Sequence, residues 1–533
     1  MKFTFLSLAL GLFLASAPAC TAEIPDTPNG SEVYVVDFYD GQEAAGNEYL
    51  QELAAENKIE ILEVLSALGD AIIQAPESQV LLIRQQDSVK VVEEDGEMDV
   101  MGWVDDVQPE EFLRGRGRSL AESTPYGITM VKAADLPDLP ASKSWKKVCV
   151  VDTGYDNSHP DLPTLGASDG MSPYGGTELW NVDGQGHGTH CAGTIGAIGD
   201  NNAGVDSVMN TYGSGFENFF IGKGLTNRGS GSWSGVISAM NACETNGASV
   251  VSMSLGGSGA STSFRDAAET LHEKGVLLIA AAGNGGNSAL SYPASYDHVM
   301  SVAAVDSSRR RARFSQYNSQ VEISGPGVSV KSTYRGGSYR YLSGTSMATP
   351  HVAGVAGLVW SHFPDCSPMQ IRYAMSKTAT KGSGQSTCDT RFGHGIVDAK
   401  ATYDFLASYP CSSWPDKFKD DEFVEYGCYA HDDAPFPSPA PNTPPSSTPA
   451  PSSAPVEGCE GWCSIVTVPW KPSSAGALAK CDWDGYCDEC PQCNCKTWCS
   501  VIPETDIPWN ATSAGELSKC GTFDIFCAGC EQC

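Results

Sequence analysis

The sequence is short of basic residues. Its 533 residues contain 33 Lys and Arg against 64 Asp and Glu, a formal net charge of −31. Nucleic acid and anionic membrane surfaces would repel such a chain, so we expect neither as a partner. After its first residues the sequence also has no apolar run long enough to cross a bilayer, so we expect no membrane span. Hydrophobic residues still make up 41% of the chain, which excludes wholesale disorder.

Cysteine is absent from a long N-terminal stretch and crowded at the other end. None lies between Cys20 and Cys149, whereas twelve of the 20 lie in the range Cys459–Cys533. Such density is typical of an oxidising compartment, where disulfides persist.

The N-terminus fits the same compartment. Lys2 precedes the apolar run Phe3–Leu14, and small residues follow that run. We therefore expect a signal peptide over residues 1–19 and a secreted, extracellular protein. A lipid anchor on Cys20 is the alternative.

Residues 31–120, which contain no cysteine, predict a small α+β unit. The runs Val33–Phe38 and Val89–Val92 are typical of strands, and Glu43–Leu65 has helical spacing. The basic, glycine-rich segment Arg114–Arg118 follows and would give a protease easy access.

Residues 121–408 alternate short apolar strands with helical patterns, which predicts an α/β fold. The expected architecture is a mostly parallel sheet with helices on both faces. Strands are expected at Lys147–Val151, Val250–Leu255, Val276–Ala282 and Val299–Val305, and helices at His187–Ile195, Ser234–Thr245, Ser263–Lys274 and Met347–His362.

The C-terminal part is first low in complexity and then repetitive. Residues 409–457 form a tail and a linker rich in Pro and Ser. Residues 458–493 and 494–533 repeat one pattern of six cysteines, so we expect two small disulfide-rich repeats rather than zinc sites. These repeats would bind a surface or polymer, or act as spacers. Asn510–Thr512 and Asn29–Ser31 are glycosylation sequons.

Three glycine-flanked motifs in the α/β unit together supply a carboxylate, an imidazole and a hydroxyl. Asp152–Gly154 follows an apolar strand, while Gly186–His190 and Gly344–Pro350 each open a helical run. A serine hydroxyl is a weak nucleophile that needs a base, and the base needs a carboxylate to fix its tautomer. Strand ends and helix N-termini are where α/β folds gather such groups. The three motifs therefore predict one site of nucleophilic catalysis.

On these motifs the chain is similar to the subtilases, the subtilisin-like serine proteases. The likeness covers about residues 123–405 and also includes His159–Leu162, Ser252–Gly257 and Ala281–Asn284. The order Asp, His, Ser along the chain is the subtilisin order, and Cys191 resembles the proteinase K subgroup. The resemblance implies a secreted serine endopeptidase that cleaves protein or peptide substrates through an acyl-enzyme.

The resemblance also implies a role for each site residue. Ser346 would be the nucleophile, His187 the general base, and Asp152 the carboxylate that orients the imidazole. Asn284 would donate its side-chain amide to the oxyanion. At a helix N-terminus, His187 is expected to favour the neutral form that a base needs. His190 is expected to be a structural core residue.

Substrate contacts transfer in the same way. Ser254, Leu255 and Gly256 resemble the strand that pairs with an extended substrate and walls the first specificity pocket. The segment that ends at Gly283 would form the facing wall, and Trp233 would be the apolar lid of a more distant pocket. Because backbone pairing reads no sequence, we expect broad cleavage with an apolar preference.

Residues 31–120 resemble the inhibitory propeptide of the family, with residues 91–96 as its last strand and turn. The resemblance implies a zymogen that processes itself and whose own propeptide is an intramolecular inhibitor. The maturation cut is expected within about residues 114–125. A parallel sheet folds slowly, which gives such a helper a physical purpose.

The resemblance implies no required cofactor, with structural calcium as an option. Glu322, with the backbone near Asp297 and Val299, occupies a position like one calcium site of the family. The sequence departs from the family between Ala203 and Lys223, where a polar stretch replaces the usual apolar strand. We therefore expect an altered sheet edge there.

If Cys20 leaves with the signal, 19 cysteines remain, and one must be unpaired or pair between chains. We expect Cys191 to be the free one, as a buried thiol. The expected bridges are Cys366–Cys388, Cys411–Cys428 and, by elimination, Cys149–Cys243.

Two other interpretations stay open. The protease fold could be inert, with the repeats as the functional part that binds a surface or polymer. Intact Asp152, His187, Asn284 and Ser346 argue against an inert fold. Alternatively the chain could be a narrow processing protease, although the matched pocket segments contain no acidic residue that would demand basic substrates.

Overall fold

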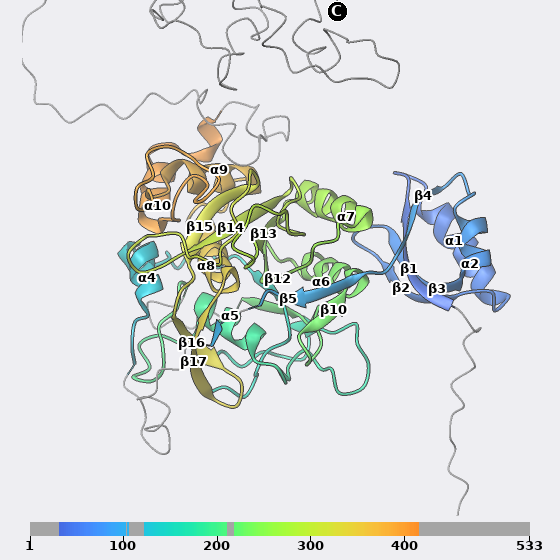
Figure 1. Cartoon of the computed structure of the whole chain (residues 1–533), viewed down its shortest axis with the longest axis horizontal. Coiled ribbons are helices and arrows are strands. Elements are labelled where there is room, and N and C mark those ends of the chain that lie inside the picture. The colour runs from blue at the N-terminus through green and yellow to red at the C-terminus, as the bar shows by residue number, and fades with distance from the viewer. Residues whose placement is uncertain (1–30, 103, 106–121, 210–217, 415–533) are drawn as a thin grey trace, which may run out of the picture. The chain divides into compact units, whose positions relative to one another are not determined.

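A computed structural model describes residues 31–102, 104–105, 122–209 and 218–414 (Figure 1). They all belong to Met1–Pro435, one of the two compact parts into which the chain divides. The predicted signal peptide, the Pro-rich linker, both repeats and the basic segment at 114–118 lie outside the described residues. Within the described part of the chain, no helix has the length and apolarity needed to cross a membrane.

The N-terminal unit, residues 31–102, is built on a four-stranded antiparallel sheet in the order β2-β3-β1-β4. Its elements are β1 (Ser31–Phe38), α1 (Glu43–Ala55), β2 (Glu60–Leu65), β3 (Asp70–Pro76), α2 (Glu77–Ile83), β4 (Val89–Glu94) and β5 (Glu97–Val100). One face of the sheet shares an apolar core with α1, in which Leu50 and Ile73 are fully buried. Residues on the other face, including Val35 and Ile72, pack into the apolar core of residues 122–414, which we call the protease-like unit.

The expectation of one helical segment over Glu43–Leu65 was wrong in its second half. The helix α1 ends at Ala55, and Glu60–Leu65 is the strand β2. Asn57 adopts a left-handed conformation with φ of 56°, which turns the chain out of the helix. The segment that follows pairs antiparallel with β3, so the two-residue period of a strand applies there.

The second unit, residues 122–414, is organised around a seven-stranded parallel sheet in the order β15-β14-β13-β11-β7-β9-β8. These strands are β7 (Val148–Val151), β8 (Gly170–Met171), β9 (Phe219–Gly222), β11 (Val250–Met253), β13 (Leu277–Ala281), β14 (Val299–Val305) and β15 (Val321–Pro326). Every residue of β7, β11, β13 and β14 is buried, which explains their continuous apolar runs. The predicted parallel α/β architecture is confirmed.

Helices pack on this sheet in two groups (Figure 1). The helix α5 (His187–Gly196) packs against α8 (Thr345–His362), and α6 (Trp233–Thr245) packs against α7 (Thr262–Glu273). The helices α9 (Pro368–Thr378) and α10 (Ala399–Ser408) follow α8, and the short helix α4 (Tyr126–Val131) precedes the sheet. The four predicted helices are confirmed within one or two residues at each end.

The expected loss of the strand ahead of Gly229 was wrong. Phe219–Gly222 forms β9, which pairs in parallel with β7 and is fully buried. The polar residues that prompted the expectation lie largely before this strand, and residues 210–217 are outside the described part. The four residues of β9 are enough to continue the sheet.

Two small sheets attach the first unit to the second. The strand β5 lies between β10 (Ser230–Ser232) and β12 (Leu255–Gly256), antiparallel to both. The short strand β6 (Val104–Asp105) pairs with β17 (Ser338–Ser343), which in turn pairs with β16 (Val330–Tyr334). Residues 97–102 and 104–105 therefore run along the surface of the protease-like unit.

Disulfide pairing followed the expectation in part. Cys149 and Cys243 are bonded, joining β7 to α6, and Cys191 is free and buried. The pairs Cys366–Cys388 and Cys411–Cys428 were wrong, because Cys366 bonds Cys411. Cys388 is disulfide-bonded as well. The expected pairs joined cysteines that are close in sequence, but the chain after α10 returns to the end of α8 and brings Cys411 to Cys366.

Candidate active site

Asp152 and His187 meet at the carboxyl edge of the sheet. Asp152 directly follows β7, and His187 is the first residue of α5. The two oxygens of the Asp152 carboxylate lie 2.8 and 2.9 Å from Nδ1 of His187. Both side chains are fully buried. This close approach needs glycine at Gly188, because a Cβ there would lie 2.2 Å from the carbonyl oxygen of Gly154.

The charge of Asp152 controls the imidazole. Burial alone lowers the pKa of His187, but the Asp152 carboxylate opposes it, and the net result is a pKa raised well above the usual value. The expectation that the helix N-terminus would favour a neutral imidazole was therefore wrong in direction. A carboxylate at hydrogen-bond distance outweighs a helix dipole, which contributes only a few tenths to about 1 kcal/mol.

Ser346 lies at the start of α8, beside the same pair. Its Oγ donates to the carbonyl of Ser254 at 3.2 Å, and Ser254 Oγ donates to the carbonyl of Ser346 at 2.9 Å. The Sγ of Cys191 lies 3.6 Å from that Ser346 carbonyl and 3.9 Å from Nδ1 of His187. Ser346 and His187, far apart in sequence, are thus both within contact of one thiol.

Cys191 and His190 have the structural surroundings that the sequence predicted. The His190 ring is fully buried, and its Nε2 lies near the carbonyls of Val330 and Arg340 at 3.1 and 3.2 Å. Burial lowers the pKa of His190 to about 3. Burial raises the pKa of the Cys191 thiol, which opposes thiolate chemistry there.

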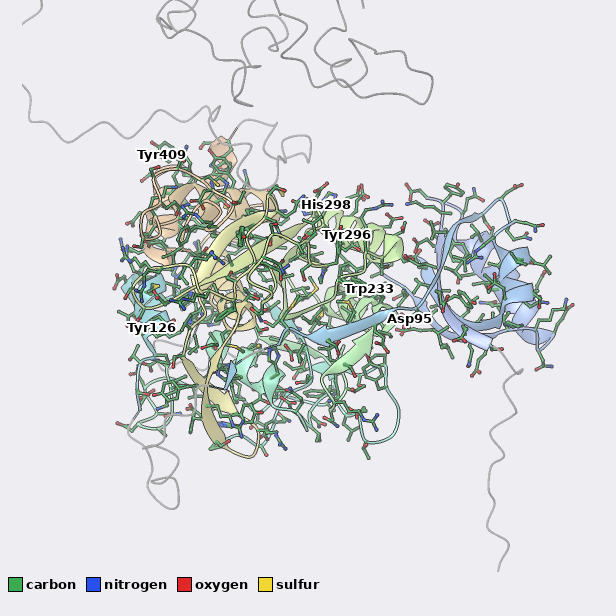
Figure 2. The ribbon with its side chains drawn as sticks, in the orientation of Figure 1. Asp95, Tyr126, Trp233, Tyr296, His298 and Tyr409 are labelled. Carbon is green, nitrogen blue, oxygen red and sulfur yellow. A yellow bond between two sulfur atoms is a disulfide. The ribbon has the colours of Figure 1, made fainter. Side chains whose placement is uncertain are left out.

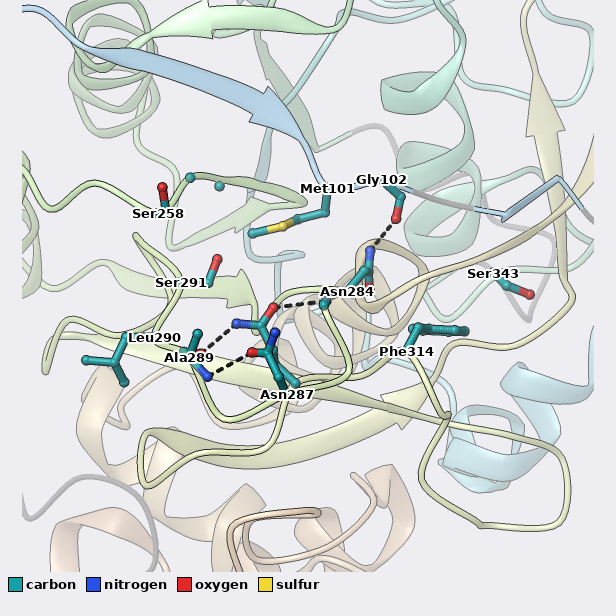
Figure 3. A pocket seen from close by; sticks show the side chains of 14 residues that line it. Met101, Gly102, Ser258, Asn284, Asn287, Ala289, Leu290, Ser291, Phe314 and Ser343 are labelled. Atoms are coloured by element: carbon teal, nitrogen blue, oxygen red, sulfur yellow. Dashed lines mark hydrogen bonds between the residues drawn. The ribbon is translucent and has the colours of Figure 1, made fainter.

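Asn284 lies just after β13, and Thr345, the residue before Ser346, fixes the orientation of its side-chain amide. Its Oδ1 accepts from the backbone N–H and the hydroxyl of Thr345 at 2.8 and 2.9 Å. Its Nδ2 therefore points outward and donates to the carbonyl of Gly102 at 2.5 Å (Figure 3). Thr345 was missed by the sequence reasoning, although it stands next to Ser346 in the same motif.

The N-terminal unit itself fills the cleft. The backbone N–H groups of Val100 and Met101 donate to the carbonyls of Gly229 and Ser254 at 2.8 and 3.4 Å. The Ser346 hydroxyl lies 3.4 Å from the carbonyl oxygen of Met101. Residues 97–101 thus lie against Ser254, Leu255 and Gly256, the strand predicted to pair with substrate.

A cavity of about 540 Å³ lies beside this segment (Figure 3). Met101 contributes to its lining, with Gly256, Ser258, Asn284, Asn287, Leu290 and Ser291 among the others. None of the described residues that line it carries a charge. Gly283 does not line it. A Cβ at Gly283 would lie 1.9 Å from the side chain of Gln316, which does line the cavity, so any larger residue at position 283 would collide with that part of the wall.

Trp233 closes the other end of the segment. Its side chain is 6% exposed, and its backbone N–H donates to the carbonyl of Gly96 at 3.0 Å. Its ring packs on that of Phe264, with the ring centroids 5.0 Å apart. Figure 2 shows Trp233 close to Asp95, at the junction of the two units. It shares an apolar cluster with the fully buried Met98, and its role as the lid of a substrate pocket stays a prediction.

Two carboxylates of the N-terminal unit cap helices of the second unit. Asp95 accepts from the backbone N–H of Ser234 at 2.8 Å, at the start of α6. Glu93 accepts from the N–H groups of Thr262 and Ser263 at 3.1 and 2.9 Å, at the start of α7. A negative charge at a helix N-terminus is stabilising, so both contacts favour the docked arrangement.

The position proposed for calcium is already filled by a side chain. The guanidinium of Arg372, on α9, donates to the Glu322 carboxylate through Nε at 2.9 Å and Nη2 at 2.5 Å. Its Nη1 donates to the carbonyl of Asp297 at 3.1 Å. A fixed cation bonded to both ligand groups leaves no charge for calcium to balance, so the residues at Glu322 do not fit that ion.

One described trio could present metal ligands. The ligand atoms of Asp152, His187 and Cys191 lie within 4.8 Å of one another and are buried. The Asp152–His187 hydrogen bond already uses two of them, so the geometry is that of an oriented base rather than of an open metal site.

Comparisons with known proteins show what the chain is similar to. Residues 144–395 match the Subtilase family, Peptidase_S8. The chain is 40% identical over 285 residues to "Subtilisin DY" of Bacillus licheniformis, a match that covers 53% of this chain and 99% of that relative. It is 34% identical over 406 residues to "M-protease" of Shouchella clausii, covering 74% and 96%. A solved structure, the psychrophilic subtilisin-like protease Apa1 from Pseudoalteromonas sp. AS-11, aligns with a TM-score of 0.49 at 31% identity and covers 55% of this chain and 100% of that one.

Proposed function

The chain belongs to the subtilase family and is a serine-type endopeptidase, and from this premise we propose that it cleaves peptide bonds through an acyl-enzyme on Ser346. The observation that carries the proposal is the contact of Ser346 Oγ with the Met101 carbonyl, 3.4 Å away, in a segment paired like a substrate. Like other subtilisins, it needs no organic cofactor.

Each of the four side chains has one task. Ser346 attacks the scissile carbonyl while His187 takes its proton, and His187 later returns a proton to the leaving amine. Asp152 holds the imidazole in the required tautomer and stabilises its cation. Asn284, fixed through Oδ1 by Thr345, presents Nδ2 to the oxyanion, a donor typically worth about 10²–10³ in turnover.

The proposed specificity is broad, with an apolar preference next to the cleaved bond. Substrate backbone would pair with Gly229 on one side and Ser254–Gly256 on the other, as Val100 and Met101 do. Such pairing contributes affinity without reading sequence. The uncharged cavity that receives Met101 favours long apolar side chains.

We propose further that the N-terminal unit is an inhibitory propeptide and that the first cut falls after Met101. Its carbonyl is the one beside Ser346 and its N–H donates to the Ser254 carbonyl, whereas the Asn284 amide donates to the next carbonyl, that of Gly102, and would have to shift to the Met101 oxygen for the reaction. The cut expected near residues 114–125 would then be a later trimming step. Secretion, cleavage of the signal, glycosylation and the disulfides of the two repeats stay predictions from the sequence.

The proposal is tested with a serine-directed fluorophosphonate and a casein assay on the purified full chain, after incubation under conditions in which wild type processes itself. Wild type should be labelled on Ser346 and should degrade casein, and labelling should abolish that activity. Ser346→Ala should show neither property, whereas Ser383→Ala, an exposed serine that does not line the cleft, should match wild type. Casein hydrolysis by Ser346→Ala at the wild-type rate would contradict the proposed function.

A further inference from the structure

Lys223 is a fully buried lysine just beyond β9, and the catalytic scheme above gives it no task. Its ammonium donates to the carbonyl of Thr153 at 2.5 Å, to Oδ1 of Asn227 at 2.9 Å and to the carbonyl of Val182 at 3.3 Å. It also lies 3.3 Å from the Glu178 carboxylate. A buried ammonium is costly unless all its donors are used, so this site is built around the charge.

The first acceptor fixes the catalytic carboxylate. Thr153 follows Asp152, and its own N–H donates to the Asp152 carboxylate at 2.7 Å. Its hydroxyl accepts from the N–H of Gly188, in the helix that His187 begins, at 2.9 Å. Thr153 therefore contacts the Asp152 carboxylate through its N–H and the helix that His187 begins through its hydroxyl, and Lys223 holds the same residue by its carbonyl oxygen.

The second acceptor belongs to the segment that binds substrate backbone. Asn227 lies two residues before Gly229, whose carbonyl receives the N–H of Val100. The same Asn227 Oδ1 accepts from the backbone N–H of Gly184 at 2.7 Å. Lys223 and Asn227 thus tie the substrate-pairing loop to the segment that carries Asp183.

The third acceptor lies in that segment. Val182 precedes Asp183, whose carboxylate accepts from the Thr153 hydroxyl at 3.0 Å and from the Thr189 hydroxyl at 2.7 Å. The Thr189 hydroxyl belongs to α5, two residues after His187. One ammonium therefore contacts the three segments that carry Asp152, orient α5 and pair with substrate.

We propose that Lys223 is a positioning residue that couples substrate-backbone pairing at Gly229 to the orientation and charge of the Asp152–His187 pair. It touches neither substrate nor reacting atoms. The inference rests on the proposed function, since it assumes that Asp152 and His187 act as a catalytic pair.

The charge of Lys223 gives the proposal a signature that packing alone would not produce. An ammonium held one residue from Asp152 disfavours a second cation on His187, so its removal should raise the pKa of the imidazole. Burial lowers the pKa of Lys223 itself, and the nearby Asp183 and Glu178 carboxylates oppose that fall. The ionisable groups around Lys223 and His187 are Asp152, Asp183, Glu178, Cys191 and His190.

The test compares Lys223→Met and Lys223→Arg with wild type on two substrates, over a range of pH. One substrate is a single-residue methionine ester, and the other is a tetrapeptide anilide ending in methionine, which can pair with Gly229. Lys146→Met is the matched control, because burial lowers the pKa of Lys146 as it does that of Lys223, but Lys146 lies against Trp360. Folding of each variant is checked by thermal unfolding with Ser346 blocked.

Lys223→Met should lose about tenfold to a hundredfold in kcat/KM on the tetrapeptide and clearly less on the ester, because mispositioning costs most where strand pairing is used. The acidic limb of its kcat/KM profile should move to higher pH, while Lys223→Arg keeps the wild-type limb. An unmoved limb together with equal losses on both substrates overturns the inference, as does the same behaviour in Lys146→Met. Because these are comparisons among active enzymes, failure here is distinct from failure of the proposed function, which would leave wild type inactive.

If Lys223→Met does not fold, Asn227→Ala decides the question. That variant keeps the ammonium and removes its link to the substrate-pairing loop, together with the acceptor of the Gly184 N–H. It should lose more kcat/KM on the tetrapeptide than on the ester while its acidic limb stays in place. Equal losses on the two substrates overturn the coupling.

Discussion

The two units of the structure treat buried carboxylates in opposite ways. In the protease unit, buried Glu322 is bonded to the guanidinium of Arg372, and buried Asp152 to the imidazole of His187. In the N-terminal unit, Asp37 and Asp70 are also buried, 2% and 8% exposed, yet they share one site with no positive group of comparable proximity. The first two carboxylates each have a basic side chain as a partner, whereas burial raises the pKa of Asp37 and of Asp70 and so favours their protonated forms. This contrast is in line with the proposal that the N-terminal unit is removed while the protease unit remains.

The largest expected effect tests how much the paired, buried Glu322 carboxylate contributes to the stability of the protease unit. Arg372→Met leaves the buried Glu322 charge without its partner, which typically costs about 3–5 kcal/mol of unfolding free energy. The double variant Arg372→Met, Glu322→Leu should regain most of that loss, because it removes the orphan charge. Urea unfolding in a Ser346→Ala background measures both. A single variant as stable as wild type would break the contrast drawn between the units.

Substitution of Asn284 tests whether its side chain stabilises the transition state more than the bound substrate. Asn284→Ala should lower kcat by about 10²–10³ with little change in KM, because its amide acts on charge that develops during the reaction. Asn287→Ala, which alters the cavity wall instead, should act mainly through KM. Steady-state kinetics on a peptide anilide separates the two, and a pure KM effect for Asn284→Ala would contradict its assignment.

The shared carboxyl site of the N-terminal unit gives a dependence on pH with a definite sign. Burial, with the Asp266 charge, raises the pKa of Asp37 to about 7, and burial, with the Asp37 charge, raises that of Asp70 to about 9. Because the docked state binds protons more tightly than the unfolded chain, its stabilisation is complete near pH 4 and is lost as pH rises through about 7 and 9. The charged groups around the site are Asp266 and Arg265 on α7, Lys90 and Glu93 on β4, and Asp40.

Hydrogen exchange on uncut Ser346→Ala protein measures this dependence. Protection factors in β1 and β4 should fall at least about tenfold between pH 6 and pH 9, the factor that corresponds to one unit of pKa shift. Asp37→Asn should flatten the change, whereas Asp87→Asn, an exposed residue of the same unit, should leave it intact. Protection that does not vary with pH would remove the second half of the comparison.

The smallest expected effect concerns the protease unit alone. Since Asp152 raises the pKa of His187, the base is lost by protonation at a higher pH than for an ordinary histidine. The acidic limb of the kcat/KM profile should therefore lie above pH 6.5, with activity rising toward alkaline pH. A limb at or below pH 6.5 would show that Asp152 does not dominate the imidazole.

The sequence allowed the parallel sheet to be predicted and the candidate catalytic residues to be named because their signals are local. Asp152, His187 and Ser346 each stand in a short glycine-flanked motif at an element boundary, and every central strand is a continuous apolar run. Other features depend on distant partners. Arg372 lies 50 residues from Glu322, and nothing in either local sequence shows that the guanidinium takes the place of a metal ion.

The same limit explains the remaining errors. Glu60–Leu65 becomes a strand because β3 pairs with it, and Cys366 bonds Cys411 because the chain returns to the end of α8. The proposed first cut after Met101 could not be derived from the sequence either, since only the structure brings Met101 to Ser346.

The most direct test is the mass of the fragment released from the N-terminus of the purified full chain. Wild type should release a fragment that ends at Met101, and Ser346→Ala should remain uncut under the same conditions. Release of the same fragment by both proteins, or a first cut elsewhere with Met101–Gly102 intact, would contradict the claim that the N-terminal unit lies in the cleft as the first substrate of Ser346.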